Sequence, residues 1–149
     1  MSQTKLATQF AKAQDSPGLL LWQLSNKWQG KQRAALKTFD LTHVQFVLLA
    51  TLTYATGTSV FTQKQLAQYA QIDVMMTSQV LRRLADKGLV RREPSKHDKR
   101  AFAIHPTSAG IKLVNQAVRE VEAVDGRFFG RLAKGSLTEF MSAMRNLVE

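Results

Sequence analysis

The side chains with the clearest chemical potential in this sequence are cationic, and they are concentrated. Eight Lys or Arg residues and three acids lie between Arg82 and Arg100, so this segment carries +5 of the formal net charge of +10. Such a cluster attracts a polyanion, either nucleic acid or an anionic membrane surface. A smaller basic group recurs at helical spacing nearer the N-terminus and is more typical of a solvated helix face. It consists of Lys27, Lys31, Arg33 and Lys37.

Residues for enzymatic or metal chemistry do not converge. His43, His97 and His105 fall in three separate predicted elements, and no HExxH spacing is present. The chain has no cysteine, which removes disulfides, thiolate nucleophiles and zinc ribbons. There is no glycine-rich phosphate loop and no GxSxG motif. We therefore expect a protein that is not an enzyme and that holds no metal or resident cofactor.

Capping residues and glycines divide the first part of the chain into four helices. We predict a helix over Pro17–Lys37, a helix from Thr42 to Gly57, a short helix opened by the capping box Thr62–Gln65, and a helix from Asp73 to Gly88. In the last of these, one apolar face is formed by Thr77, Val80, Leu81 and Leu84. Two short helices joined at Gln71-Ile72 are typical of a helix-turn-helix.

The pattern then changes to extended segments and back to helix. Leu89–Glu93 and Ala101–His105 predict a two-stranded hairpin around a basic turn over 94–99. Apolar residues then recur every three or four positions over Ile111–Leu132, with an interruption at Asp125. Ser136 is predicted to cap a final helix whose inward residues are Leu137, Phe140, Met141, Met144 and Leu147.

These elements predict a mainly α fold with a small β-hairpin wing (α+β), a winged helix-turn-helix flanked by dimerisation helices. We expect an N-terminal dimerisation helix in residues 1–40, a DNA-binding domain in residues 41–107 and C-terminal dimerisation helices in residues 108–149. The apolar stripe of the C-terminal helices exceeds what one small winged domain can cover, so a homodimer is favoured over an intramolecular helical pair.

The predicted second short helix supplies the groups that can read DNA. Gln79 can pair bidentately with adenine, Arg82 with guanine or a phosphate, and Ser78 with a base or a phosphate. Met75 can touch a thymine methyl group, whereas Met76 is as well suited to packing beneath the helix. Double-stranded DNA is therefore the expected partner.

The hairpin tip offers a second contact, because a cationic wing can lie along the adjacent minor groove. Its candidates are Lys96, Lys99 and Arg100, with Asp98 expected to accept hydrogen bonds from the Arg100 guanidinium and so to organise the wing. Gln63 and Lys64 can meet phosphate at the start of the preceding helix. The full set of candidate DNA-binding residues is Gln63, Lys64, Met75, Thr77, Ser78, Gln79, Arg82, Arg83, Lys96, Lys99 and Arg100.

With these residues in place, the sequence resembles the MarR family of regulators from about Pro17 to the C-terminus. The resemblance is carried by Leu41–Leu49, by Val80–Val90, and by Asp98-Lys99-Arg100 followed by Thr107–Gly110. Pro106 departs from the family pattern, which commonly has an apolar residue such as leucine there. A proline removes one donor from the strand ladder.

The resemblance implies an obligate homodimer on a pseudo-palindromic DNA site, with half-sites about one helical turn apart. It also implies a ligand-responsive repressor that releases DNA when a small aromatic or phenolic effector binds between the dimerisation and DNA-binding parts. Trp22, Trp28, Phe46 and Tyr54 lie in segments that can line such a crevice, although aromatic residues at this spacing more often belong to a core.

Two alternatives remain open. A winged domain can act as an architectural or protein-interaction module with little sequence specificity, in which case wrong bases would cost almost nothing. Membrane-surface binding is less favoured, because the cations do not lie opposite an apolar face of one exposed helix. With no signal pattern and no long apolar run, we expect a cytoplasmic protein.

Overall fold

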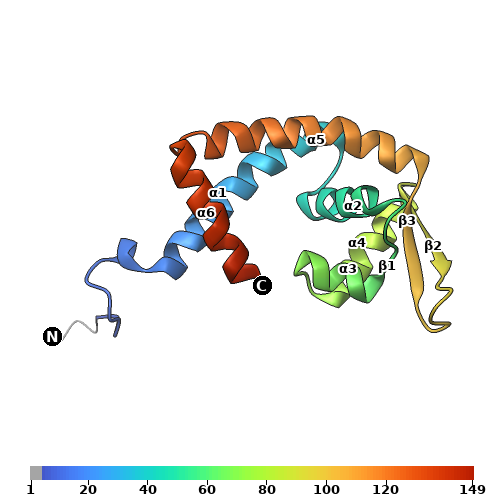
Figure 1. Cartoon of the computed structure of the whole chain (residues 1–149), viewed down its shortest axis with the longest axis horizontal. Helices are drawn as coiled ribbons and strands as arrows, with labels where there is room; N and C mark the ends of the chain where they lie inside the picture. The colour runs from blue at the N-terminus through green and yellow to red at the C-terminus, as the bar shows by residue number, and fades with distance from the viewer. Residues whose placement is uncertain (1–4) are drawn as a thin grey trace.

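The helices and strands of the computed structural model follow the predicted order, and the structure describes residues 5–149 (Figure 1). The helices are α1 (Pro17–Leu36), α2 (His43–Ala55), α3 (Gln63–Ala70), α4 (Val74–Asp86), α5 (Ser108–Phe129) and α6 (Lys134–Val148), with 3-10 turns η1 (Ala13–Asp15) and η2 (Lys37–Phe39). The strands are β1 (Phe61–Thr62), β2 (Val90–Pro94) and β3 (Phe102–Pro106). The predicted fold class, a mainly α chain with a hairpin wing, is confirmed.

The predicted caps determine where three of these helices begin. Thr42 Oγ1 accepts the Gln45 backbone N–H at 3.1 Å, and Gln45 Oε1 accepts the Thr42 N–H at 3.0 Å. Thr62 and Gln65 form the same reciprocal pair at the start of α3. Asp73 Oδ2 accepts the Met76 N–H at 3.1 Å at the start of α4. Each pair satisfies backbone donors that a helix cannot satisfy internally.

The sheet has three strands in the order β1-β3-β2, and β1 was not predicted. Phe61 pairs with Ile104 and Thr62 with Ala103, and two residues are too few for a period-two pattern to emerge. The hairpin is confirmed one residue later than predicted on each strand. β3 continues through Pro106, which lies opposite Val90, so the proline is accommodated at the strand's last position.

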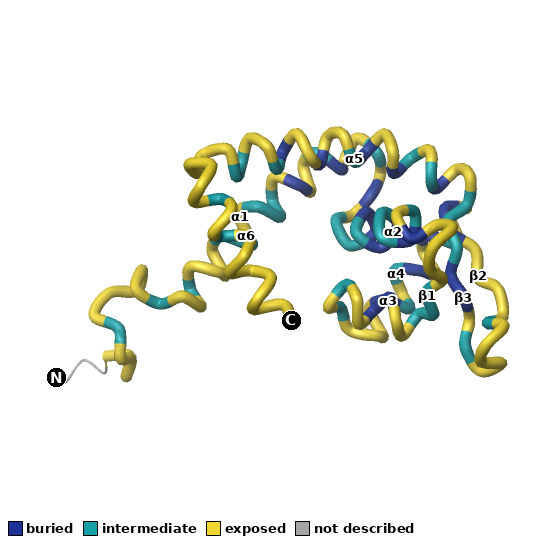
Figure 2. The backbone as a smooth tube through the Cα atoms, viewed as in Figure 1, coloured by how far each residue is buried: buried dark blue, intermediate teal, exposed yellow. Residues whose placement is uncertain are grey.

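The core of the chain lies beneath the sheet and between α2, α3, α4 and the first half of α5 (Figure 2). Its largest fully buried apolar side chains are Leu36, Leu48, Leu49, Leu66, Leu81, Leu84 and Ile104. Val114 and Ala117 of α5 join the same cluster, so the winged domain (residues 41–107) is packed directly against α5. This packing holds α4 and the hairpin at a defined position relative to α5.

The start of α5 approaches the start of β2 very closely. Thr107 donates its backbone N–H to the Leu89 carbonyl at 3.0 Å and its hydroxyl to the Gly88 carbonyl at 2.6 Å. The Cα of Gly110 lies so near that an added Cβ would sit 2.1 Å from the Leu89 carbonyl oxygen. Glycine is therefore required at position 110 by space rather than by backbone conformation.

Asp125 interrupts the apolar stripe of the long C-terminal helix, as predicted, but it does not break the helix. α5 runs through it to Phe129, and its carboxylate ties α5 to α1. Asp125 Oδ1 accepts the Trp28 Nε1–H at 2.7 Å and the Gln32 Nε2–H at 2.8 Å, and Gln32 also donates to the Val121 carbonyl. A carboxylate inside an apolar helix face is accommodated because two donors from α1 satisfy it.

In the stem (α1, α5 and α6), the first half of α5 packs on the winged domain, whereas the end of α5, the start of α1 and α6 lie away from it, with α6 crossing near α1 (Figure 1). The predicted cap at Ser136 is wrong: α6 begins at Lys134 with Ala133 at the N-cap and no side-chain capping bond, so Ser136 lies within the first turn of the helix. The predicted inward face of α6 contains no buried residue in a single chain. No helix within residues 5–149 is long and apolar enough to cross a membrane.

Candidate nucleic-acid interface

The first two turns of α4 present the expected side chains to solvent. The Met75 side chain is 74% exposed and that of Met76 is 47% exposed, so Met76 does not pack beneath the helix. Gln79, Arg82 and Arg83 are exposed as well, and Ser78 is half-buried. The opposite face is anchored in the core through Leu81 and Leu84. α4 therefore offers a polar and thioether surface on a rigidly packed helix.

Thr77 is the exception, and its prediction as a DNA contact is wrong. Its side chain is fully buried, and its hydroxyl donates to the Asp73 carbonyl at 2.9 Å. It lies on the face of α4 that carries Leu81 and Leu84, because positions four and seven residues apart share one side of a helix. Thr77 stabilises the first turn of α4 from its buried side.

The tip of the hairpin between β2 and β3 is cationic and exposed. Lys96, Lys99 and Arg100 all lie at the surface, and the Arg100 side chain is 95% exposed. Asp98 organises this turn in a different way from the one expected. Its Oδ1 accepts the backbone N–H of Arg100 at 2.9 Å and lies 3.8 Å from the Arg100 Nε. Asp98 therefore shapes the backbone through this hydrogen bond and holds Arg100 only by a long ion pair, which leaves the guanidinium exposed to solvent.

The other basic residues of the hairpin are partly engaged within the protein. Arg91 Nε pairs with Glu93 Oε1 at 2.9 Å, and Glu93 Oε2 lies 3.5 Å from His105 Nε2 on the neighbouring strand. By contrast, no ion pair within the described residues involves Arg82, Arg83, Lys96 or Lys99. The cations of this segment that form no ion pair within the described residues are thus Arg82 and Arg83 of α4, Arg92 of β2, and Lys96 and Lys99 of the hairpin tip.

The start of α3 supplies Gln63 and Lys64 as predicted. Gln63 is half-buried and Lys64 is exposed, both in the first turn after the Thr62 cap. Backbone N–H groups in a first turn have no partner within the helix, which suits them to an anionic oxygen. α3 and α4 are joined through Gln71, which adopts a left-handed conformation with φ 56°.

The four aromatic residues considered for an effector crevice do not come together. Phe46 belongs to the core, Trp22 is exposed, and Trp28 is tied to Asp125. Only Tyr54 lines a groove of about 820 Å³ between α2, α3, β1 and α5. Its other aromatic walls, Phe61 and Tyr69, were missed by sequence reasoning, and their 5.5 Å ring contact depends on the unpredicted strand β1.

The described residues contain no group of three or more side chains suited to hold a metal ion. His43 instead lies against Trp28, with ring centroids 5.0 Å apart in an edge arrangement. Burial lowers the pKa of His43 below 6.5, Arg33 lowers it further, and Asp125 opposes both. His43 is therefore a neutral packing residue at neutral pH.

Comparison with known proteins agrees with this arrangement. The family model described as MarR family matches residues 41–102. The chain is 41% identical over 144 residues to the uncharacterized HTH-type transcriptional regulator YdcH of Bacillus subtilis, covering 95% of this chain and 96% of that protein. It is 32% identical over 136 residues to the HTH-type transcriptional repressor Rv2887 of Mycobacterium tuberculosis, covering 91% and 96%.

The fold is similarly represented among solved structures. The S. aureus MepR–DNA complex superposes with a TM-score of 0.81 at 23% identity, covering 89% of this chain and 96% of that one. The sequence identity over nearly the full length and the family model that matches the helix-turn-helix lead to the same family. The chain belongs to the MarR family of transcriptional regulators.

Proposed function

We propose that this protein is a homodimeric repressor that binds a pseudo-palindromic operator through α4 and the hairpin wing. The observation that carries the proposal is the pairing of an exposed reading face on α4 with an exposed cationic tip on the adjacent hairpin. A helix of this kind enters the major groove while a basic wing follows the minor groove. Such a regulator acts on chromosomal DNA, which places it in the cytoplasm.

Within this proposal the side chains divide by role. Gln79 and Arg82 read base edges, and Met75 contacts a thymine methyl group. Ser78 and Arg83 contact bases or phosphates at the margin of the groove. Phosphates are held by the remaining exposed groups, which are Gln63, Lys64, Lys96, Lys99 and Arg100.

The stem supports the homodimer. Its apolar side chains line a groove of about 720 Å³ whose walls come from the first part of α1, the end of α5 and the second half of α6. They include Leu20, Leu21, Leu24, Trp28, Phe128, Phe129, Phe140, Met144 and Leu147. A helix such as α6, with an apolar face but no buried residue, requires a partner surface in water. A second copy of the same stem offers that surface.

The groove beside Tyr54 supports regulation by a small aromatic or phenolic effector. It has aromatic walls from Tyr54, Phe61 and Tyr69 and aliphatic walls from Val114 and Val118. The groove touches both α3 and α5, so a ligand there contacts the helix-turn-helix and the stem together. Filling it by Val118→Phe should abolish the rise in melting temperature that a bound phenol or aromatic acid produces.

The decisive experiment is selection of a randomised duplex pool by the purified protein at about 150 mM salt, where non-specific attraction is weak. We expect an enriched inverted repeat with half-sites about one turn apart. Arg82→Ala should then relax the preference at one position per half-site, by about 1 to 3 kcal/mol. Lys112→Ala, which removes one exposed charge from α5, should leave that preference unchanged.

Salt-sensitive binding without an enriched site would instead support the architectural alternative. In that case Gln79 and Arg82 would be ordinary surface residues, and their substitution would change affinity equally for all sequences.

A further inference from the structure

Lys87 lies at the C-terminal end of α4. Its side chain connects that helix to the corner between α1 and α2. It occupies the C-cap position of α4, and its side chain is only 33% exposed. The corner contains η2 and Asp40, which follow α1 directly. Because α1 belongs to the stem, a contact here joins the DNA-reading helix to the part of the molecule proposed to form the dimer.

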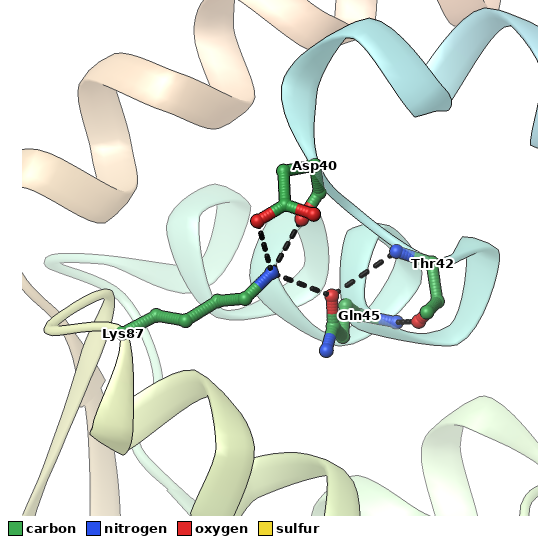
Figure 3. Close-up of polar contacts among 4 residues, drawn as sticks. All are labelled: Asp40, Thr42, Gln45 and Lys87. Atoms are coloured by element: carbon green, nitrogen blue, oxygen red, sulfur yellow. Dashed lines mark hydrogen bonds and ion pairs between the residues drawn. The ribbon is translucent and has the colours of Figure 1, made fainter.

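The Lys87 contact (Lys87 with Asp40 and Gln45) places three acceptor atoms around the ammonium group (Figure 3). Nζ donates to the backbone carbonyl of Asp40, lies 3.4 Å from Asp40 Oδ2, and lies 3.5 Å from Gln45 Oε1. An ammonium group has three donors, and three acceptors surround it here. Charge-assisted hydrogen bonds of this type are stronger than neutral ones.

Both acceptor residues are held in place by local structure. Asp40 has φ 53° and ψ 41°, a left-handed conformation that aspartate tolerates, and its N–H is bonded to the Lys37 carbonyl. Gln45 is buried, and its Oε1 also accepts the Thr42 N–H in the capping box of α2. The ammonium group therefore docks onto a preformed turn and a capped helix start.

The Asp40 carboxylate itself contributes least. It is 98% exposed, so water screens its attraction to Lys87. The surrounding groove of about 600 Å³ also contains Arg33, Lys37 and Arg83, whose charges repel the ammonium group, and Asp86, whose charge attracts it. The backbone carbonyl and the buried amide are the acceptors that hold Lys87.

We propose that Lys87 is a positioning residue that fixes the orientation of α4 relative to α1 and thereby sets the half-site spacing that the dimer accepts. The inference rests on the proposed function, since it concerns how two reading helices meet one operator. Each added base pair rotates one half-site by about 35° around the duplex. A dimer with rigidly held reading helices tolerates such a rotation poorly, and a dimer with loosened ones tolerates it better.

The test measures affinity of the full chain for operators whose spacer is optimal, one base pair shorter and one base pair longer. For Lys87→Met we expect affinity at the optimal spacing to fall about tenfold, as loss of a charge-assisted contact predicts. Affinity for the operators with altered spacers should fall less than about threefold. The ratio of affinities between the optimal and the altered spacers should therefore become smaller than in the wild type. If Lys87→Met does not fold, Lys87→Gln carries the same expectation.

Two control variants separate positioning from charge. Lys37→Met removes the same charge from the same groove and should lower affinity equally at all three spacings. Asp40→Asn keeps the left-handed turn and the carbonyl acceptor, and it should retain wild-type discrimination within about twofold.

The outcomes distinguish this inference from the proposed function. A folded Lys87→Met dimer that discriminates spacings as wild type does overturns the inference and leaves the operator-binding proposal intact. A wild-type protein that shows no preference among sequences or spacings overturns both. Narrowed discrimination in Lys87→Met, with wild-type discrimination in Lys37→Met, supports the inference.

Discussion

Replacing Gly110 by alanine tests whether the close approach of α5 to β2 holds the wing in place. The new Cβ would lie 2.1 Å from the Leu89 carbonyl oxygen, 3.0 Å from its carbonyl carbon and 3.2 Å from Leu49 Cδ1. The first contact involves backbone, so α5 and β2 must separate by roughly 1 Å to reach ordinary contact distance. Overpacking of this kind costs about 1 to 3 kcal/mol.

The displacement also disrupts hydrogen bonds. Thr107 donates to the carbonyls of Leu89 and Gly88 across the same junction, and each bond contributes about 1 kcal/mol. We therefore expect Gly110→Ala to lower the free energy of unfolding by about 2 to 4 kcal/mol, and the melting temperature by roughly 5 to 15 °C. Operator affinity should fall as well, because β2 carries the wing.

The matched control is Gly30→Ala in the interior of α1. There the added Cβ meets only Arg33 Nη2, at 3.7 Å, which is an ordinary contact. Alanine in a helix interior is favoured over glycine by about 0.5 to 1 kcal/mol, so this variant should be slightly stabilised. Both are measured by thermal and urea unfolding at one protein concentration, because the stability of the proposed dimer depends on concentration. A Gly110→Ala protein as stable as wild type would refute the reasoning.

Three further outcomes are expected. Arg100→Ala, which alters a fully solvated tip residue, should weaken operator binding at least about tenfold with an unchanged melting temperature; unchanged binding would show that the wing does not contact DNA. Asp125→Ala should destabilise the chain by about 2 to 4 kcal/mol in urea unfolding, because the donors of Trp28 and Gln32 lose their acceptor; a change below about 0.5 kcal/mol would contradict this. Because the pKa of His43 is lowered in the folded chain, the unfolded chain binds a proton at His43 more tightly than the folded chain does. The free energy of unfolding should therefore have its full value above pH 6.5 and decrease as the pH falls below it. His43→Gln should reduce this decrease, which is measured by comparing melting temperatures at about pH 5.5 and about pH 7.5.

Local signals in the sequence were sufficient for most of the secondary structure and for most candidate DNA contacts. The boxes at Thr42 and Thr62 and the cap at Asp73 act within four residues, so their effect on helix starts is readable without tertiary information. The exposed positions of Gln79 and Arg82 follow from the helical period, because Leu81 and Leu84 identify the buried side of α4.

Local patterns failed where a residue's role depends on a distant partner. The role of Asp125 as an acceptor could not be predicted because its donors, Trp28 and Gln32, lie more than ninety positions away along the chain. Lys87 was one cation in a cluster until the structure placed Asp40 and Gln45 around its ammonium group.

What the sequence by itself determined was the order of the helices and the hairpin, the helix starts at Thr42, Thr62 and Asp73, and the exposed face of α4, all of which depend on contacts within a few residues. The tertiary structure alone decided the third strand, the fully buried state of Thr77, the need for glycine at 110 and the junction at Lys87. The reason is that burial, steric exclusion and satisfaction of polar groups depend on which distant segments pack together, and no local period encodes that pairing.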